Sequence, residues 1–84
     1  MVTFYIGDCP ICKTYGRLEI DVDSATNEYF VMCEECLAEW ETPQDAIRNI
    51  GGRRDNRHSQ VRSATFDEIQ SLGWDKFVVS SEGI

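Results

Sequence analysis

The chain of 84 residues lacks several features that would mark a particular class of protein. It has no apolar run approaching the roughly 18 residues that a membrane-spanning helix needs, so we expect no transmembrane segment. Its first residues carry no basic stretch followed by a long apolar run, so we expect no secretory signal. A cytoplasmic protein is the expectation that follows.

Basic residues are scarce as well. Eight Lys and Arg stand against fifteen Asp and Glu, which leaves a net charge of −7. A chain this acidic is a poor candidate for non-specific binding to phosphate backbones. Motifs of catalysis are also missing: there is no Gly-rich phosphate loop, no H-E-x-x-H and no G-x-S-x-G. The single histidine, His58, has no partner in the sequence that marks it as a general base. We therefore predict that the protein is not an enzyme.

Four cysteines are the residues that carry recognisable chemistry. They form two C-x2-C pairs, Cys9 with Cys12 and Cys33 with Cys36, separated by 20 residues. In a reducing compartment such pairs more often hold a metal than form disulfides. Each tight turn brings two sulfurs to one ion, and four thiolates at about 2.3 Å close a tetrahedral shell. We predict a structural Zn2+, with a redox or structural dithiol pair and an iron site as the alternatives.

The residues around the cysteines resemble the knuckles of zinc ribbons. The first knuckle reads Cys-Pro-Ile-Cys-Lys-Thr-Tyr-Gly, with Gly16 at its end. Lys13 and Leu37 follow directly after the second cysteine of each pair, where many such knuckles carry glycine. A residue at that place is expected to need a left-handed backbone, which side chains other than glycine resist. The resemblance covers residues 4–42 and implies a zinc-bound ribbon.

Strand patterns between and after the knuckles complete this ribbon. Residues 17–23 alternate strictly, with three apolar side chains on one face and Glu19, Asp21 and Asp23 on the other, which predicts a half-buried strand. A turn-rich break at residues 24–28 precedes a second strand at 29–32, and residues 37–41 can add a third, with Trp40 packed on the sheet. We predict an α+β fold that contains a zinc ribbon with a three-stranded antiparallel sheet.

The second half of the chain predicts a helix-loop-helix-strand extension over residues 43–80. Thr42 is placed as an N-cap and Pro43 as the first residue of a helix that runs to about residue 50, where Gly51 and Gly52 end it. Residues 53–60 are polar and predict a loop. Residues 65–68 form a capping box for a second helix that stops near residue 73. Residues 76–80 predict a strand and 81–84 a frayed tail. With so small a core, rarely worth more than about 3–5 kcal/mol, we expect one domain, 1–84.

Charge is divided unevenly along the chain. Residues 1–47 hold ten acids and two bases, whereas residues 48–62 hold five arginines and one acid. The acids can be a solvated face or a surface that docks a basic protein, because complementary fields speed association. The arginines can be a loop that offsets nearby acids or a phosphate-binding segment, because guanidinium groups hold phosphate bidentately. The candidate partner-binding acids are Glu19, Asp21, Asp23, Glu34, Glu35, Glu39 and Glu41, and the candidate phosphate-binding residues are Arg48, Arg53, Arg54, Arg57 and Arg62.

Three classes of function stay open on these grounds: a module that binds a basic protein, a nucleic-acid or transcription-associated ribbon, and a small electron carrier with iron. The layout is similar to small bacterial zinc-ribbon proteins, with Trp40 soon after the second pair, a Thr-Pro helix start and Gly73-Trp-Asp-Lys-Phe77 near the end. In size and acidity the chain also resembles immunity proteins of bacterial toxin systems, including contact-dependent inhibition. That resemblance implies a protein that binds and neutralises a toxin, such as a basic nuclease.

Overall fold

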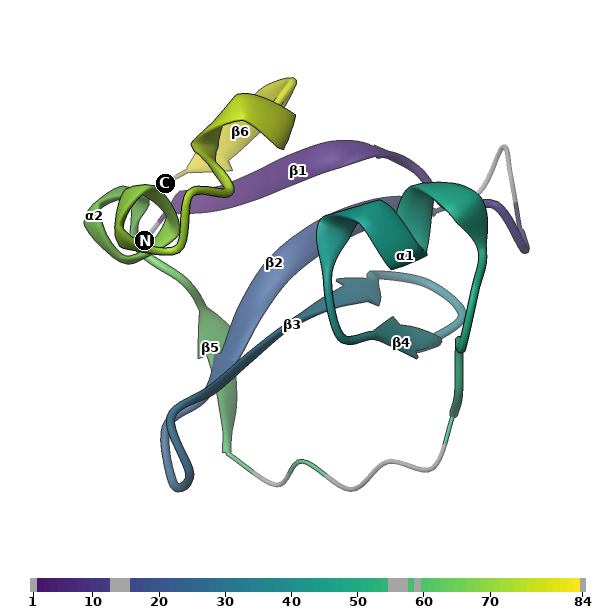
Figure 1. Ribbon diagram of the computed structural model, residues 1–84, viewed down its shortest axis with the longest axis horizontal. Helices are drawn as coiled ribbons and strands as arrows, with labels where there is room; N and C mark the ends of the chain where they lie inside the picture. The colour runs from purple at the N-terminus through teal and green to yellow at the C-terminus, as the bar shows by residue number, and fades with distance from the viewer. Residues whose placement is uncertain (1, 13–15, 55–57, 59, 84) are drawn as a thin grey trace.

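A computed structural model describes residues 2–12, 16–54, 58 and 60–83. Within these residues the chain forms a six-stranded antiparallel sheet, two short α-helices and one 3-10 helix (Figure 1). The elements in chain order are β1 (Val2–Asp8), β2 (Arg17–Asp23), β3 (Glu28–Cys33), β4 (Glu39–Trp40), α1 (Pro43–Arg48), β5 (Val61–Ser63), α2 (Phe66–Ser71), the 3-10 helix (Asp75–Phe77) and β6 (Ser80–Gly83).

The central strand β2 organises the sheet. The strand order is β4-β3-β2-β1-β6, and β5 also pairs with β2. β3 pairs with β2 along residues 18–23, whereas the other edge of β2 is shared: β1 pairs with residues 17–19 and β5 with residues 21–23. The register of β1 shifts between Tyr5 and Gly7, and Gly7 has a φ of +132°, a value that favours glycine. At this irregularity β1 stops pairing with β2, and β5 pairs with the rest of the same edge of β2.

One face of the central strands forms the apolar core. Leu18 and Ile20 of β2 lie opposite Cys33 and Val31 of β3, and all four are fully buried. Because side chains on a strand alternate between faces, these residues share one side of the sheet. Helices α1 and α2 contribute buried apolar side chains to the same cluster, and Trp40 of β4 completes it. The segment 43–80 therefore shares its core with the segment 4–42.

The opposite face of the central strands carries acidic residues and is covered by the connection from α1 to β5. Arg53 exchanges two backbone hydrogen bonds with Glu39 of β4, at 2.8 and 3.0 Å. His58 stacks on Phe30 of β3, with ring centroids 4.2 Å apart and planes 9° apart. The backbone carbonyl of Gln60 accepts a hydrogen bond from the Ser24 backbone N–H. These contacts attach the connection to the sheet at three places.

The helix starts are set by side chains that cap backbone N–H groups. Thr42 Oγ1 accepts from the backbone N–H of Asp45 and Pro43 begins α1, as predicted. The capping box at Thr65 and Glu68 is also confirmed, since each side chain accepts from the other residue's backbone N–H. α1 ends earlier than predicted, at Arg48, because Asn49 adopts a left-handed backbone (φ 54°) that stops the helix before the glycines.

The α+β fold and the C-terminal strand are confirmed, but the sheet is larger than the predicted three strands. β1 and β5 are strands that the sequence pattern did not indicate. The C-terminal strand is shifted: residues 75–77 form the 3-10 helix, and β6 occupies residues 80–83, where a frayed tail was predicted. β6 is polar and exposed, and it is ordered by pairing with β1 rather than by burial. No helix in the described ranges is long and apolar enough to cross a membrane.

Candidate metal centre

The first knuckle follows β1 directly. Cys9 is buried and Cys12 is half-buried. The backbone N–H of Cys9 donates to the carbonyl of Gly16 at 2.9 Å, which closes the turn between β1 and β2. The backbone N–H of Ile11 points at Cys9 Sγ, 3.4 Å away. This donor stabilises negative charge on the sulfur.

The second knuckle connects β3 to β4 and has a similar arrangement. Cys33 is the last residue of β3, and its Sγ accepts from the backbone N–H groups of Glu35 and Cys36, each at 3.4 Å. The carbonyl of Cys33 accepts from the backbone N–H of Leu37 at 3.3 Å, and its N–H donates to the carbonyl of Ala38 at 2.9 Å. The sheet therefore fixes one cysteine of the pair, and a tight turn presents the other.

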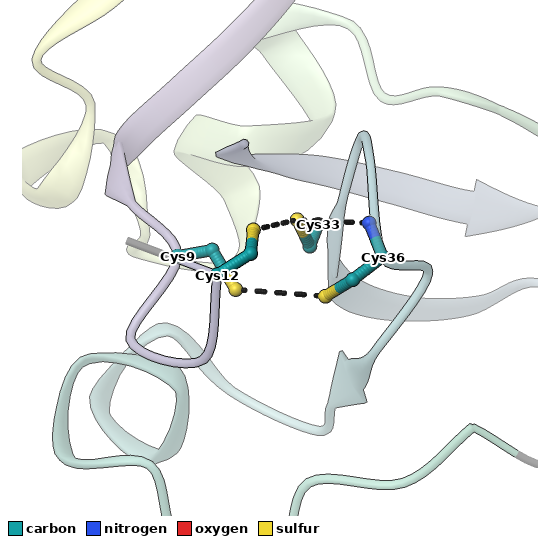
Figure 2. A group of neighbouring side chains, drawn as sticks. All are labelled: Cys9, Cys12, Cys33 and Cys36. Carbon is teal, nitrogen blue, oxygen red and sulfur yellow. Dashed lines mark hydrogen bonds between the residues drawn. The ribbon is translucent and has the colours of Figure 1, made fainter. Parts of the chain in front are cut away.

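The four sulfurs converge on one point (Figure 2). Cys9 Sγ lies 3.7 Å from Cys36 Sγ, Cys12 Sγ lies 3.4 Å from Cys33 Sγ, and all four lie within 4.8 Å of one another. In a tetrahedron with metal–sulfur bonds of about 2.3 Å, neighbouring sulfurs are about 3.8 Å apart. The donor set, its spacing and its N–H contacts thus suit one tetrahedral metal ion. All four cysteines are free, so no disulfide competes for them.

Burial and nearby hydrogen-bond donors shift the pKa values of Cys33 and Cys36 in opposite directions. It raises the pKa of Cys33 to about 12, although the backbone N–H groups of Cys36 and Glu35 oppose the rise. Burial acts in the same direction on Cys36, but the backbone N–H of Ala38, the Cys33 side chain and the Arg54 guanidinium outweigh it and lower the pKa of Cys36 to about 7. A metal ion must therefore displace protons from at least part of the site, which makes loading weaker in acid.

Two backbone positions next to the sulfurs are sterically special. A Cβ at Gly16 would overlap Cys33 Sγ and lie 2.9 Å from Cys12 Sγ, so only glycine leaves room for the sulfurs. Leu37 has a φ of +62°, which confirms the left-handed backbone expected after the second pair. Its side chain is 56% exposed and repays little of that strain by burial. Lys13, the corresponding position of the first pair, lies outside the described residues.

Three of the predicted partner-binding acids are buried. The alternating pattern predicts that Asp21 and Asp23 face solvent, and this is wrong: they are 1% and 3% exposed, and His58 of the connection from α1 to β5 lies against Asp23. Glu39, opposite Met32 of β3, is 5% exposed. Desolvation, with the neighbouring carboxyl groups of Glu19 and Glu39, raises the pKa of Asp21 to about 9. Asp21 is therefore protonated at neutral pH.

The other four predicted acids remain accessible to different degrees. Glu35 and Glu41 are exposed, and Glu19 and Glu34 are half-buried. Glu34 accepts a hydrogen bond from Arg17 Nε at 3.0 Å. Burial alone would raise the pKa of Glu34, but the contact with Arg17 outweighs it, so the pKa is lowered. The acidic surface available to a partner is thus narrower than the seven-residue stripe that the sequence indicates. The part of these residues in binding a partner stays a prediction.

His58 occupies a position that sequence reasoning did not anticipate. Its side chain is 3% exposed, and its Nδ1 lies 3.1 Å from Asp23 Oδ2. The backbone N–H of Ala25 donates to Asp23 Oδ1 at 2.9 Å. This hydrogen bond and the contact with His58 outweigh the effect of burial and lower the pKa of Asp23. Asp23 is therefore ionised, and Nδ1–H of the imidazole is the donor. A lone histidine in a polar stretch carries no local signal of this burial.

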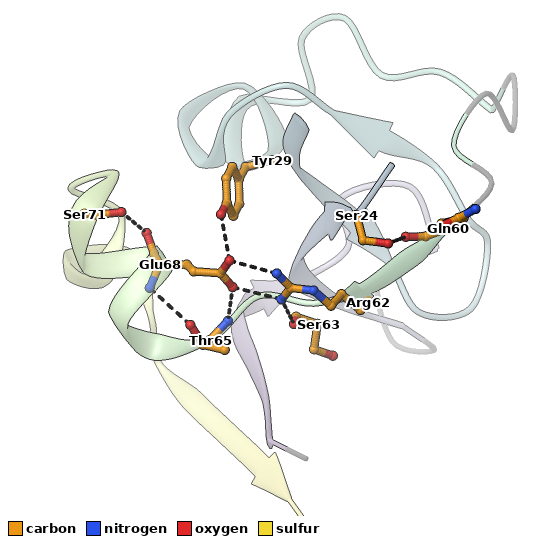
Figure 3. A network of polar contacts seen from close by, with 8 residues as sticks. All are labelled: Ser24, Tyr29, Gln60, Arg62, Ser63, Thr65, Glu68 and Ser71. Carbon is orange, nitrogen blue, oxygen red and sulfur yellow. Dashed lines mark hydrogen bonds and ion pairs between the residues drawn. The ribbon is translucent and has the colours of Figure 1, made fainter. Parts of the chain in front are cut away.

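Of the candidate phosphate-binding arginines that the structure describes, Arg62 and Arg53 form ion pairs within the chain, and Arg54 lies against the Cys36 side chain. Arg62 donates from both terminal nitrogens to the two carboxylate oxygens of Glu68, at 2.9 and 2.8 Å (Figure 3). Arg53 pairs with exposed Glu41 at 3.2 Å. Arg48 and Arg54 are exposed. Arg57 lies outside the described residues. Arg53 and Arg62 thus offset acids of the same chain, and phosphate binding by the arginine segment stays a prediction.

Comparison of the chain with models of known protein families, with curated protein sequences and with solved structures finds no match.

Proposed function

We propose that the four cysteines hold a structural Zn2+ and that the protein is a non-enzymatic binding module. The observation that carries the metal assignment is the convergence of four sulfurs, two on each knuckle, within 4.8 Å. Zn2+ commonly takes four thiolates in structural sites, and four thiolates leave no coordination position open for substrate or water. Such a site stabilises the fold and does not act on a bound molecule.

The charge around this centre supports a basic protein as the partner. Four thiolates on one divalent ion carry a net charge of −2. Asp8 immediately precedes the first cysteine and Glu35 lies inside the second knuckle, and both are exposed. These acids and the charge of the metal–thiolate centre would steer a basic surface toward the knuckles. Exposed Ile11 and Leu37 at the knuckles add apolar area for such a contact.

The most specific form of this proposal is an inhibitor or immunity protein that neutralises a basic toxin domain, such as a nuclease. Its support is the small size, the net charge of −7 and the layout of the chain. The pairing of Arg53 and Arg62 with acids of the same chain weighs against the alternative, a nucleic-acid-binding ribbon, because these two guanidinium groups are occupied.

The partner proposal is tested with the metal-loaded protein. We expect a tagged protein to retain one basic protein from its host lysate at near-equal stoichiometry and to release it at high salt. The double variant Asp8→Lys, Glu35→Lys should weaken the isolated complex at least tenfold. The matched control is Asp67→Lys, since this exposed acid lies on α2, at the opposite end of the molecule from the end of β1 (Figure 1). If the tagged protein instead retains RNA or DNA, and the variants Arg48→Glu or Arg54→Glu no longer do so, the nucleic-acid alternative replaces the proposal.

The metal assignment has its own test. The purified protein should contain one zinc per chain and be colourless, whereas iron bound by four thiolates would absorb visible light. Cys33→Ser or chelation should unfold the protein, because a structural zinc site contributes on the order of 10 kcal/mol to folding. A fully folded, metal-free wild type would contradict the assignment.

A further inference from the structure

The four cysteines differ in how easily a small molecule can reach them. Cys9 and Cys33 are buried, whereas Cys12 and Cys36 are half-buried. Cys36 lines a cavity of about 360 Å³, and none of the other three cysteines is among the residues that line it. The side of the metal centre that meets this cavity is therefore the side of Cys36.

The walls of this cavity decide which molecules can approach the Cys36 sulfur. Leu37, Val61 and Arg54 line it and are exposed, so the cavity is open to solvent. A small uncharged molecule such as hydrogen peroxide can enter without electrostatic cost. An anionic disulfide such as oxidised glutathione is bulkier, and the net charge of −7 on the chain repels it. The cavity thus favours a small neutral oxidant.

Each sulfur of the centre has a close neighbour on the other knuckle. Cys9 Sγ lies 3.7 Å from Cys36 Sγ, and Cys12 Sγ lies 3.4 Å from Cys33 Sγ (Figure 2). Both contacts join one knuckle to the other and not the two cysteines of one C-x2-C pair. When Cys36 is oxidised, Cys9 is therefore in place to react with it.

We propose that Cys36 is a peroxide-sensitive residue and that Cys9 resolves its oxidised form, so that a disulfide bond joins the two knuckles and the metal ion is released. The proposal rests on the metal centre proposed above. Metal binding keeps the sulfurs as thiolates, which is the form of cysteine that attacks peroxides.

The oxidation takes place in two balanced steps. The Cys36 thiolate attacks one oxygen of hydrogen peroxide; an S–O bond forms, the O–O bond breaks, and the second oxygen leaves as hydroxide, which a proton from solvent converts to water. The sulfur loses two electrons to the peroxide and becomes a sulfenic acid. The Cys9 thiolate then attacks this sulfur; an S–S bond forms, the S–O bond breaks, and hydroxide again leaves as water after protonation. Two thiolates, one peroxide and two protons thus give one disulfide and two waters.

This disulfide removes half of the metal ligands. Only Cys12 and Cys33 remain as thiolates, whereas a structural zinc site uses four ligands. Because Glu35 lies inside the second knuckle, loss of the ion also disturbs the surface proposed for the partner. Peroxide therefore acts against partner binding.

The test uses the zinc-loaded wild-type protein, whose zinc content is measured before any oxidant is added. Hydrogen peroxide is then added together with a chromophoric chelator that does not remove zinc from the untreated protein. We expect each peroxide consumed to release one zinc and to remove two thiols, and peptide mapping to find a disulfide between Cys9 and Cys36. Dimedone, which traps sulfenic acids, should label Cys36 first when it is present during the reaction. Oxidised glutathione at the same concentration should release zinc more slowly.

Two variants separate access to Cys36 from the stability of the centre. Val61→Trp narrows the cavity and should slow zinc release several-fold at an unchanged zinc content. Val79→Trp is the matched control, since Val79 is exposed and is not among the residues that line the cavity, and it should react like the wild type.

The inference is overturned if the protein keeps its zinc in peroxide, if dimedone labels Cys12 first, or if the first disulfide lies within one C-x2-C pair. These outcomes use the wild-type protein and so do not depend on whether cysteine variants fold. A protein that holds no zinc before peroxide is added would contradict the metal assignment itself, and that result is obtained separately.

Discussion

Arg62 and Glu68 form a bidentate ion pair that joins β5 to α2. The Glu68 carboxylate also accepts from the Tyr29 hydroxyl of β3 at 2.8 Å and from the backbone N–H of Thr65 at 2.9 Å. One carboxylate thus connects β3, β5 and the start of α2, as Figure 3 shows. These donors, Arg62 first among them, hold the pKa of Glu68 well below its usual range.

Glu68→Gln should lower Tm by a few degrees, because glutamine can keep the capping box but loses the charge pair with Arg62. Since the pKa of Glu68 is depressed in the folded state, its contribution to stability is present above the ordinary glutamate pKa of about 4.3 and is lost as the pH falls below it. The variant should therefore lose less stability than the wild type in thermal melts between pH 6 and pH 3. Parallel curves would show that the pair contributes nothing.

Asp21→Asn should stabilise the protein at neutral pH. The folded state raises the pKa of Asp21 to about 9. The stability that the protonated Asp21 contributes to the fold is therefore fully present below about pH 4 and is lost as the pH rises toward 9. Asparagine removes the cost of keeping a proton on a buried carboxyl, and we expect a gain of about 2–4 kcal/mol at pH 7. Urea unfolding of both proteins at pH 4, 7 and 9 measures this. The free energy of unfolding should change little in the exposed control Asp67→Asn. Equal stabilities of the wild type and the Asp21→Asn variant at pH 7 would refute the buried, protonated state of Asp21.

Gly16→Ala should disrupt the metal centre. The new Cβ would lie 2.9 Å from Cys12 Sγ and would overlap Cys33 Sγ, which the sheet holds in place. We expect at least a tenfold loss of zinc affinity, measured by competition with a chromophoric chelator. Gly51→Ala is a suitable control, since in the described part of the chain no atom beyond Gly51 and its two chain neighbours lies within 4 Å of the Cβ position, although its φ of +72° makes the variant mildly destabilising. Unchanged affinity in the Gly16 variant would mean that the knuckles can move apart.

Leu37→Gly should stabilise the second knuckle. A left-handed backbone costs a non-glycine residue about 1–2 kcal/mol, which the glycine variant avoids. The greater freedom of glycine in the unfolded chain reduces this gain in stability by about 0.5–1 kcal/mol. A net increase of about 0.5–1 kcal/mol in the free energy of unfolding is expected from chemical denaturation of the zinc-loaded protein. Leu37→Ala keeps the strain and should show no such gain. A loss of stability in the glycine variant would indicate that the exposed leucine packs on something in the folded protein.

Much of the candidate metal site follows from the sequence. The repeated C-x2-C spacing predicts four converging sulfurs, and the structure brings them within 4.8 Å. The sequence marks Gly16 only as the end of a knuckle, and its close approach to two sulfurs is evident only from their positions. Strands β1 and β5 escape prediction because their pairing depends on a bulge at Gly7 and on a path of the chain that no local pattern records.

The sequence by itself determined the features that depend on residues within one or two turns of each other: the two knuckles, the Thr42 cap, the Thr65–Glu68 capping box and the apolar face of β2. Only the tertiary structure decided what covers the other face. Alternation tells which side chains share a side of a strand, but not whether solvent or another segment meets them. Here Arg53 of the connection pairs with Glu39 and His58 lies against Asp23, on the face where Asp21 is buried as well. Contacts between residues so far apart in the chain arise from the path of the backbone. Because of that path, three of the acids that the sequence places on an exposed stripe are buried.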